Sequence, residues 1–309
     1  MAEGARGGSG DGWFQFGFCF GKATEAGLEV APLLVGGEAG PVRCVRPSWS
    51  FSGIVRAGGS PPVLLQGAVC AALPEDCRDV LPSETHVLLL RKAAVESWPV
   101  EGSALVLEGE PAWRCEILPE EAEIVELPLV PGGYVAPRPP FFTPLPSTLQ
   151  ARKLALGYEH AVLLNTEGAL FSWGGGRHGQ LGHGELESRT EPQLVEALYG
   201  VPLVDVAAGG WHSAGISEAG DLYIWGWNET GQLALPSKSV AESRATTAEV
   251  KRGTGELYTW GWGKYGQLGH GQTASSDEAK RVSCFVDWGL RVVDVVCGPW
   301  TTYVHAVAQ

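Results

Sequence analysis

The chain has 309 residues, with 22 lysines and arginines against 35 aspartates and glutamates, which gives a formal net charge of −13 at pH 7. Hydrophobic residues make up 44% of the sequence and charged residues 18%, and this balance excludes an intrinsically disordered chain. The acidic charge argues against non-specific binding to nucleic acid, which requires clustered lysine and arginine, and favours attraction to a basic partner. The 43 glycines and 12 tryptophans are typical of many short strands joined by tight turns.

The N-terminal residues and the cysteines bear on the compartment. The first residues lack the apolar stretch of a secretory signal. The longest uncharged run of the first hundred residues, 57–74, contains Pro61, Pro62 and several glycines, which makes it a poor membrane helix. The seven cysteines are an odd, scattered set, as expected for reduced thiols. We therefore expect a nuclear or cytoplasmic protein that binds no membrane.

Three segments of the N-terminal half predict strands. Residues 13–21 (WFQFGFCFG) form an alternating strand that ends in Phe16-Gly17. Residues 49–54 (WSFSGI) resemble residues 211–216 (WHSAGI) of a repeat in the C-terminal half, with Gly and Ile at the same distances after Trp. The run from His86 to Trp98 has a similar length to a hairpin of that repeat. These matches are weak singly and depend on the clearer copies.

Residues 116–150 interrupt this pattern with an acidic and then a Pro-rich stretch. Five glutamates lie between positions 116 and 126, and seven prolines follow between 128 and 146. Prolines remove backbone donors and favour an extended path. We interpret 116–150 as a surface connector. The alternative is a partner-binding segment that exposes the pair Phe141 and Phe142 beside an acidic flank.

A repeat organises the C-terminal half. Residues 168–184, 220–236 and 255–271 align without gaps, and each contains Trp-Gly, four variable residues and then Gly-Gln-Leu. The tryptophans are Trp173, Trp225 and Trp260, and the first two lie 52 residues apart. This spacing is about the size of one four-stranded propeller blade.

A Gly-x-x-His element precedes two of the three copies. It begins at Gly157 and Gly209, and its histidines His160 and His212 each lie 13 residues before the tryptophan. A glycine, which tolerates positive φ, stands at the turn between the two strands of each unit. Each unit therefore predicts a hairpin whose second strand ends in Trp-Gly.

The third copy follows the second too closely. Trp225 and Trp260 are only 35 residues apart, which is 17 fewer than the repeat requires, and Gly-x-x-His is missing between them. Four-stranded blades need their strands, so residues 236–254 cannot hold a complete blade path. We interpret 236–254 as a shortened, trimmed loop, natural or engineered.

The two ends of the chain complete each other. Residues 292–305 match the first strand of the hairpin and then stop, whereas residues 13–21 match the second strand and have no first strand before them. A ring of sheets closes when such strands pair, which removes two exposed sheet edges. We predict that 13–18 pairs antiparallel with about 302–307.

The pattern Gly-x-x-His, Gly-x-Leu-Tyr-x-Trp-Gly and Gly-Gln-Leu-Gly resembles the repeat of the regulator of chromosome condensation (RCC) family. The match is strongest over 154–271, fair at both ends and weak over 68–150. The resemblance implies an all-β fold, a seven-bladed β-propeller of RCC-type repeats that forms a single domain over 1–309. A six-bladed ring is the alternative, because of the short spacing before Trp260.

The motifs that could carry chemistry have structural explanations. Residues 174–179 and 261–266 fit Gly-x-Gly-x-x-Gly, but a Gln-Leu-Gly turn follows them and the motif recurs with the repeat. The loop histidines His178, His183 and His270 lack a set of zinc ligands. Serine-hydrolase, Walker and zinc-protease motifs are missing. We therefore predict a protein without catalytic residues, metal or cofactor.

The aromatic residues and histidines divide into two groups. The repeated Trp173, Trp225 and Trp260 are expected to pack between blades, and the repeated His160 and His212 to hydrogen-bond neighbouring backbone in the core. The loop aromatics that vary between copies are candidate partner contacts, because such rings anchor interfaces. The alternative is that they only close the faces of the ring. With the Phe pair, the candidates are Trp211, Trp227, Trp262, Tyr265, Trp300, Phe141 and Phe142.

A propeller presents loop faces onto which different sites are grafted, so the fold does not determine the function. The expected function therefore comes only from the family resemblance. The family implies a nuclear, chromatin-associated setting for a non-enzymatic interaction scaffold. The expected partner is a chromatin-modifying enzyme of the jumonji-type, histone-acting oxygenase class, or a basic, histone-like surface. The alternative is guanine-nucleotide exchange on a small GTPase, an activity of the founding family member. That member has a basic N-terminal tail, whereas this chain has Arg6 among glycines and serines.

Overall fold

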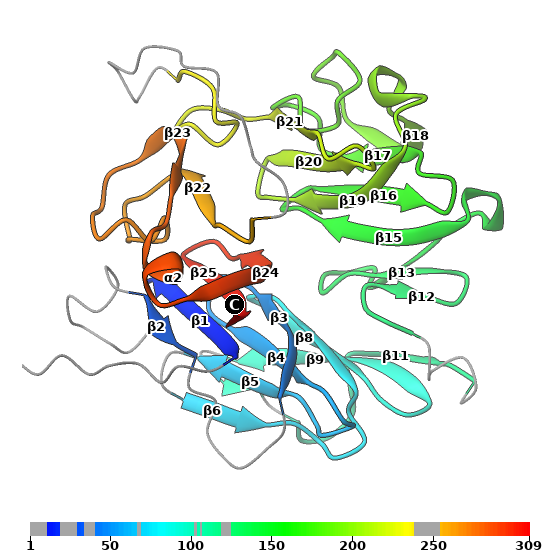
Figure 1. Cartoon of the computed structure of the whole chain (residues 1–309). Helices are drawn as coiled ribbons and strands as arrows, with labels where there is room; N and C mark the ends of the chain where they lie inside the picture. Colours follow the sequence, from blue (N-terminus) through cyan, green and yellow to red (C-terminus); the bar gives the residue numbers. More distant parts are fainter. Residues whose placement is uncertain are drawn as a thin grey trace, which may run out of the picture.

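The structure is a computed structural model that describes residues 11–18, 30–33, 41–66, 69–101, 104–105, 107–118, 125–237 and 254–309. Among these residues antiparallel strands predominate, and helical turns are confined to η2 (Ser147–Leu149), η3 (Glu196–Leu198) and α2 (Cys284–Asp287). No helix in this part of the chain is long and apolar enough to cross a membrane. Figure 1 shows the sheets following one another around a common centre. The fold is the predicted all-β propeller.

The strands are short and follow the chain around the ring. They are β1 (Gly12–Gly17), β2 (Ala31–Pro32), β3 (Val42–Pro47), β4 (Ser52–Arg56), β5 (Val63–Gln66), β6 (Val69–Ala72), β7 (Asp79–Pro82), β8 (His86–Leu90), β9 (Ala94–Glu101), β10 (Ala104–Leu105), β11 (Trp113–Glu116), β12 (Leu129–Val130), β13 (Gly133–Val135), β14 (Phe142–Pro144), β15 (Ala151–Leu156), β16 (His160–Asn165), β17 (Leu170–Gly174), β18 (Arg189–Leu194), β19 (Leu203–Ala208), β20 (His212–Ser217), β21 (Leu222–Gly226), β22 (Tyr258–Gly261), β23 (Ser276–Arg281), β24 (Leu290–Cys297) and β25 (Thr301–Ala308).

The strands group into sheets that are mostly consecutive in sequence. Four-stranded sheets have the orders β2-β1-β25-β24, β3-β4-β5-β6 and β15-β16-β17-β18. The sheet β7-β8-β9 is extended by β10 and β11, which both pair with the long strand β9. The orders β12-β13-β14 and β19-β20-β21 have three strands, and β22-β23 has two. The hydrophobic clusters lie between neighbouring sheets, for example where Val55 of β4 meets Val80 of β7.

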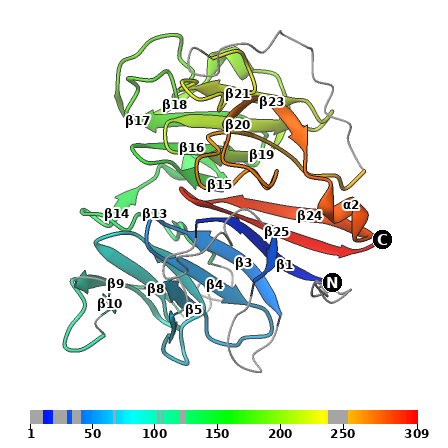
Figure 2. The ribbon, with the colours of Figure 1, turned by 90° about the vertical axis from the view of Figure 1, so that its left-hand side faces the viewer.

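The predicted closure of the ring is confirmed. Strand β1 pairs antiparallel with β25 from Gly12 opposite Ala306 to Gly17 opposite Thr301. Figure 2 shows the blue N-terminal strand beside the red C-terminal one. Gly17 has a φ of 111°, and Gly226, which ends the equivalent strand β21, has a φ of 112°. The two chain ends therefore rebuild the same hairpin that the continuous chain forms elsewhere.

The predicted hairpins of the repeat are also confirmed. Strands β16 and β17 pair with Ala161 opposite Trp173, and β20 and β21 pair with Ser213 opposite Trp225. The turn glycines Gly168 and Gly220 have φ of 82° and 97°, a conformation that residues with a Cβ rarely adopt.

The blade count is not the predicted seven. Six sheets of the described residues have three strands or more, and the seventh, β22-β23, is half a blade. The reason is the short spacing between Trp225 and Trp260, because β21 and β22 are consecutive and the chain between them is too short for the strands of a full blade. The structure therefore holds six blades, the alternative number. The expected trimmed loop 236–254 lies mostly outside the described residues.

The segment 116–150 is more than the predicted connector, and its Phe pair is not exposed as the alternative interpretation required. Strands β12, β13 and β14 form a small sheet within it. Phe141 is 9% exposed and packs in the same core cluster as Leu90 and Val135. Its ring lies 4.9 Å from the His86 ring, and Phe142 is half-buried against this cluster. The backbone turns back on itself here, with Phe141 N donating to Arg138 O, so the sequence pattern alone misplaced the ring.

The repeated tryptophans link each blade to the one before it. The indole N–H of Trp225 donates to Gln180 O and that of Trp260 to Gln232 O, both at 2.9 Å. The accepting carbonyls belong to the Gln of the Gly-Gln-Leu loops. The indole N–H of Trp173 donates to Tyr134 Oη at 3.1 Å, in the small sheet of the preceding segment. The Trp-Gly and Gly-Gln-Leu elements of the repeat are thus two halves of one contact between blades.

The glycine of Gly-x-x-His makes room for the histidine ring. A Cβ on Gly209 would overlap the ring of His212, whereas one on Gly210 would have no atom within 4 Å. We expect Gly209→Ala to lower the free energy of unfolding by about 1–3 kcal/mol through overpacking. Gly210→Ala, its matched control, should change it by less than about 0.5 kcal/mol. Urea unfolding of both variants measures the difference, and equal effects would contradict this explanation of the motif.

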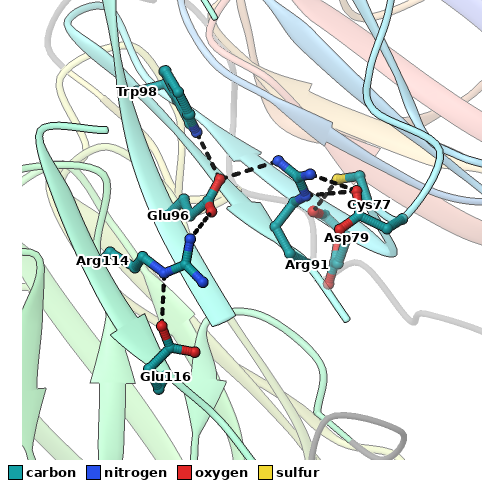
Figure 3. Close-up of polar contacts among 8 residues, drawn as sticks. Cys77, Asp79, Arg91, Glu96, Trp98, Arg114 and Glu116 are labelled. Atoms are coloured by element: carbon teal, nitrogen blue, oxygen red, sulfur yellow. Dashed lines mark hydrogen bonds and ion pairs between the residues drawn. The ribbon is translucent and has the colours of Figure 1, made fainter. Parts of the chain in front are cut away.

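An ionic network around the buried Glu96 joins strand β9 to β11 and to the turn between β8 and β9. Figure 3 shows the Glu96 carboxylate between the guanidinium groups of Arg91 and Arg114. Arg91 Nη1 lies 3.1 Å and Arg114 Nη1 3.0 Å from its two oxygens, and Trp98 Nε1 donates to it at 3.0 Å. Glu96 is only 5% exposed, so it depends on these hydrogen-bond donors, whose arginines reach solvent.

Candidate protein-interaction face

Two kinds of loop emerge at the same end of the ring. In an antiparallel blade, the loop after the first strand and the loop after the third strand lie at the same end. The first kind is a tight turn that recurs: Gly157 N donates to His160 O, and Gly209 N to His212 O. Ser48 N donates to Phe51 O and Gly298 N to Thr301 O in the same way. These equivalent turns bring the variable residues of four blades to one face.

The loops at this end carry rings that touch in one continuous series, which we call the aromatic face. It consists of Phe18, Trp49, Tyr158, His178, Trp211, Trp227, Trp262, Tyr265 and Trp300. Trp227 lies 5.3 Å from Trp211 between ring centroids, and Trp211 lies 5.3 Å from Tyr158. The ring of Trp49 lies 6.5 Å from that of Tyr158 and 4.6 Å from that of Trp300. Trp49 therefore joins the rings around Trp211 to a second group around Trp300.

The second half of the aromatic face surrounds Trp300. Its ring lies 5.5 Å from Trp262 and 5.1 Å from Tyr265, and Tyr265 lies 5.6 Å from Phe18. Most of the pairs are edge-to-face, the arrangement that aromatic quadrupoles favour. Such packing leaves ring faces open to solvent. Trp49 is 37%, Phe18 38% and Tyr158 39% exposed, and the remaining rings are half-buried.

Charged side chains border the aromatic face. The guanidinium carbon of Arg138 lies 4.6 Å from the centroid of Tyr158, and Arg138 Nη1 donates to Tyr158 O at 2.9 Å. Lys264 Nζ lies 6.0 Å from the centroid of Tyr265. Glu159 is paired with Arg177 at 2.9 Å. The rings therefore already accept cations from the chain itself, as expected from their negative faces.

The histidines of the repeat are neutral groups of the scaffold. Burial lowers the pKa of His160 to about 4, with a smaller contribution from His212, whose own pKa burial also lowers. His160 Nε2 lies 2.8 Å from Ser213 Oγ, a hydroxyl of the next blade, and the backbone of His212 also interacts with the ring. His183 and His270 each lie 3.0 Å from a hydroxyl of the preceding strand. Neutral, hydrogen-bonded rings of this kind serve packing.

The described part of the chain gives little support for metal binding, reactive thiols or a nucleotide-binding loop. No group of three histidines, cysteines or carboxylates there could hold a metal ion. The six described cysteines are unpaired, and burial raises the pKa of Cys77 to about 12, which keeps its thiol protonated. The Gly-x-Gly-x-x-Gly segments form tight turns, with Gly179 N donating to Gly176 O and Gly266 N to Gly263 O.

The structure brings five of the predicted contact residues together and separates two. Trp211, Trp227, Trp262, Tyr265 and Trp300 all belong to the aromatic face, whereas Phe141 and Phe142 pack elsewhere. Sequence reasoning did not single out Trp49 and Tyr158, which bridge the series. A signal existed, because both occupy the first variable position of the recurring turn.

These features define a class of protein: a β-propeller in which a Gly-x-x-His turn, a Trp-Gly strand end and a Gly-Gln-Leu loop recur from blade to blade. The sequence profile of the regulator of chromosome condensation (RCC1) repeat matches residues 167–216 and 254–304, and a second profile of the same description matches 151–180 and 203–232. The chain belongs to the RCC1 repeat family, as the sequence predicted.

Curated relatives match over almost the whole chain. RCC1 domain-containing protein 1 of Homo sapiens is 42% identical over 374 aligned residues, which cover 96% of this chain and 97% of the human protein. The protein of the same name in Mus musculus is 41% identical over 376 residues, with the same coverage. The alignments are longer than this chain, so they contain gaps in it.

Solved structures show the same fold at low identity. Prp20p from Saccharomyces cerevisiae matches with a TM-score of 0.66 at 14% identity, covering 97% of this chain and 92% of that protein. Its crystal structure was described together with its binding properties to Gsp1p and histones. Human WBSCR16 matches with a TM-score of 0.52 at 17% identity, covering 97% and 99% of the two chains.

Proposed function

We propose that this chain is a non-enzymatic protein–protein interaction scaffold that binds its partner through the aromatic face, in a nuclear, chromatin-associated setting. The proposed partner is a chromatin-modifying enzyme, a jumonji-type oxygenase that acts on histones, or a basic, histone-like protein. The observation that carries the proposal is the continuous series of rings at one end of the propeller.

The aromatic face has the composition of an interface core. Trp and Tyr are the residues that most often dominate binding energy, because they bury large areas with little loss of conformational freedom. Rings that served packing alone would be covered by the fold, whereas Trp49 and Tyr158 expose more than a third of their surface. Aromatic clusters of this size on a protein surface mark interaction sites.

The family and the charge support the setting. The family takes its name from the regulator of chromosome condensation, and the structural neighbour Prp20p is described as binding histones. The formal net charge of −13 raises the association rate with a basic partner. None of the catalytic motifs sought in the sequence accompanies the aromatic face.

A double variant tests the proposal. We expect Trp211→Ala combined with Trp300→Ala to reduce capture of the specific partners from nuclear extract by about tenfold or more, because it removes rings from both halves of the series. Quantitative mass spectrometry of the captured proteins measures the loss. Recombinant jumonji oxygenases and histones, added singly, then identify the direct partner.

The matched control is Tyr199→Ala. Tyr199 is 76% exposed and follows η3, away from the recurring turns, so this variant should capture the same proteins as the wild type. Circular dichroism of each variant establishes that it is folded, and the single variant Trp49→Ala repeats the test at an exposed ring. Undiminished capture by folded variants of the aromatic face would overturn the proposal.

Nucleotide exchange on a small GTPase is the alternative function. This alternative depends on the family resemblance alone. Release of labelled GDP from small GTPases, with and without this protein, distinguishes the two functions. Accelerated release would favour exchange over the scaffold.

A further inference from the structure

A small cleft interrupts the aromatic face between two of its recurring turns. It lies between the loop joining β3 to β4 and the loop joining β24 to β25. The rings of Trp49 and Trp300 line it together with the hydroxyl-bearing residues Ser48, Ser50 and Ser52. The cleft thus combines π surfaces with oxygen acceptors.

A carboxylate is fixed next to this cleft. Glu84 lies in the turn between β7 and β8, which emerges at the same end of the ring. Its Oε1 accepts from Ser50 N at 2.9 Å and its Oε2 from Ser50 Oγ at 2.5 Å, so Ser50 lines the cleft and holds the carboxylate at the same time. Both oxygens are thereby oriented by one residue of the cleft.

Glu84 differs from the carboxylates of the ion pairs in the fold. Asp79, Glu96 and Glu159 each form an ion pair with an arginine. Within the described ranges, no lysine, arginine or histidine lies within ion-pair distance of Glu84, which is exposed. The carboxylate is therefore positioned by hydrogen bonds without a cation to neutralise it.

We propose that this cleft is a binding site for one arginine side chain from a basic segment of the partner. The guanidinium group would pair with Glu84 and lie against the rings of Trp49 and Trp300. The same face already shows this chemistry, because the guanidinium of Arg138 lies over Tyr158. Arginine fits better than lysine, since its planar group stacks on rings and donates to a carboxylate through two nitrogens. The inference rests on the proposed function and names the chemistry of the partner.

The test uses a labelled peptide of glycine, serine and arginine, and the same peptide with citrulline, the uncharged isostere, in place of each arginine. Fluorescence anisotropy with the full chain should give about tenfold tighter binding of the arginine peptide. In Glu84→Gln this preference should fall to about twofold or less, because the variant keeps the side-chain shape and loses the charge. The matched control is Glu159→Gln, whose carboxylate is already paired with Arg177, and it should keep the full preference.

The outcomes separate this inference from the function on which it rests. Equal binding of the two peptides by the wild type, or an unchanged preference in Glu84→Gln, would overturn the arginine site. An equal loss in both glutamate variants would also overturn it, because the effect would then come from the overall charge. In the extract experiment, Trp211→Ala alone removes a ring that does not line the cleft, so it tests the scaffold function independently of the arginine site.

Discussion

Replacing Phe16 by alanine should lower the free energy of unfolding by about 3–5 kcal/mol, the cost of removing a large buried ring. Phe16 is 2% exposed and lies in β1, the strand that closes the ring. It packs in one cluster with Val304 of β25 and Leu257 of the preceding half-blade. The ring also lies against Gly269, where a Cβ would come within 2.9 Å of it. Urea unfolding followed by tryptophan fluorescence measures the change.

The control for this variant is Tyr199→Ala. Its ring is also lost, but Tyr199 is 76% exposed, so the expected change is within about 0.5 kcal/mol. The comparison decides whether the N-terminal strand belongs to the folded ring. If Phe16→Ala costs no more than Tyr199→Ala, the closure of the propeller by its two termini is wrong.

The closure was predictable because the hairpin has a local signature. Phe16-Gly17 stands where the repeat has Trp-Gly, and a glycine is needed there because the carbonyl of the facing turn approaches closely. The same requirement recurs at Gly174 and Gly226, where a Cβ would clash with the carbonyls of Glu159 and Trp211. Because this steric constraint requires a glycine at the same place in each hairpin, the sequence alone allowed strands from distant parts of the chain to be matched.

The blade count and the small sheet β12-β13-β14 were not predictable in the same way. A missing stretch before Trp260 shows only that strands are lacking, not how the remaining ones associate. In the Pro-rich stretch, the ring of Phe141 is buried because the chain folds back onto His86, which is distant in sequence. The alternative interpretation placed this ring on the surface, and a tertiary contact buries it instead.

The candidate site was only partly predictable from the sequence. Copy-to-copy variation distinguished Trp211 and Trp300 from the repeated tryptophans, although all are the same residue type. It could not show that the varying rings touch, because contact between blades depends on the curvature of the ring. Trp49 and Tyr158 became visible as part of the site only once the equivalent turns were placed side by side.

Replacing Glu96 by glutamine should also lower the free energy of unfolding, by about 2–3 kcal/mol, because hydrogen bonds to a buried charged group are weakened. The variant keeps the shape of the side chain but removes the charge that two arginines share, as Figure 3 shows. One acceptor oxygen also becomes an NH2 group, which then faces either a guanidinium or the indole N–H of Trp98. Urea unfolding at constant ionic strength measures the loss.

The same substitution at Glu116 provides a control that shares one of the arginines. Arg114 Nε donates to Glu116 Oε1 at 2.8 Å, yet the Glu116 side chain is 69% exposed, against 7% for Glu96. Water compensates an exposed ion pair, so Glu116→Gln should cost at most about 1 kcal/mol. A large difference between the two variants would show that burial, rather than the number of ion pairs, determines what this network contributes. Equal costs would mean that the ion pairs of Glu96 contribute no more to stability than the exposed pair of Glu116.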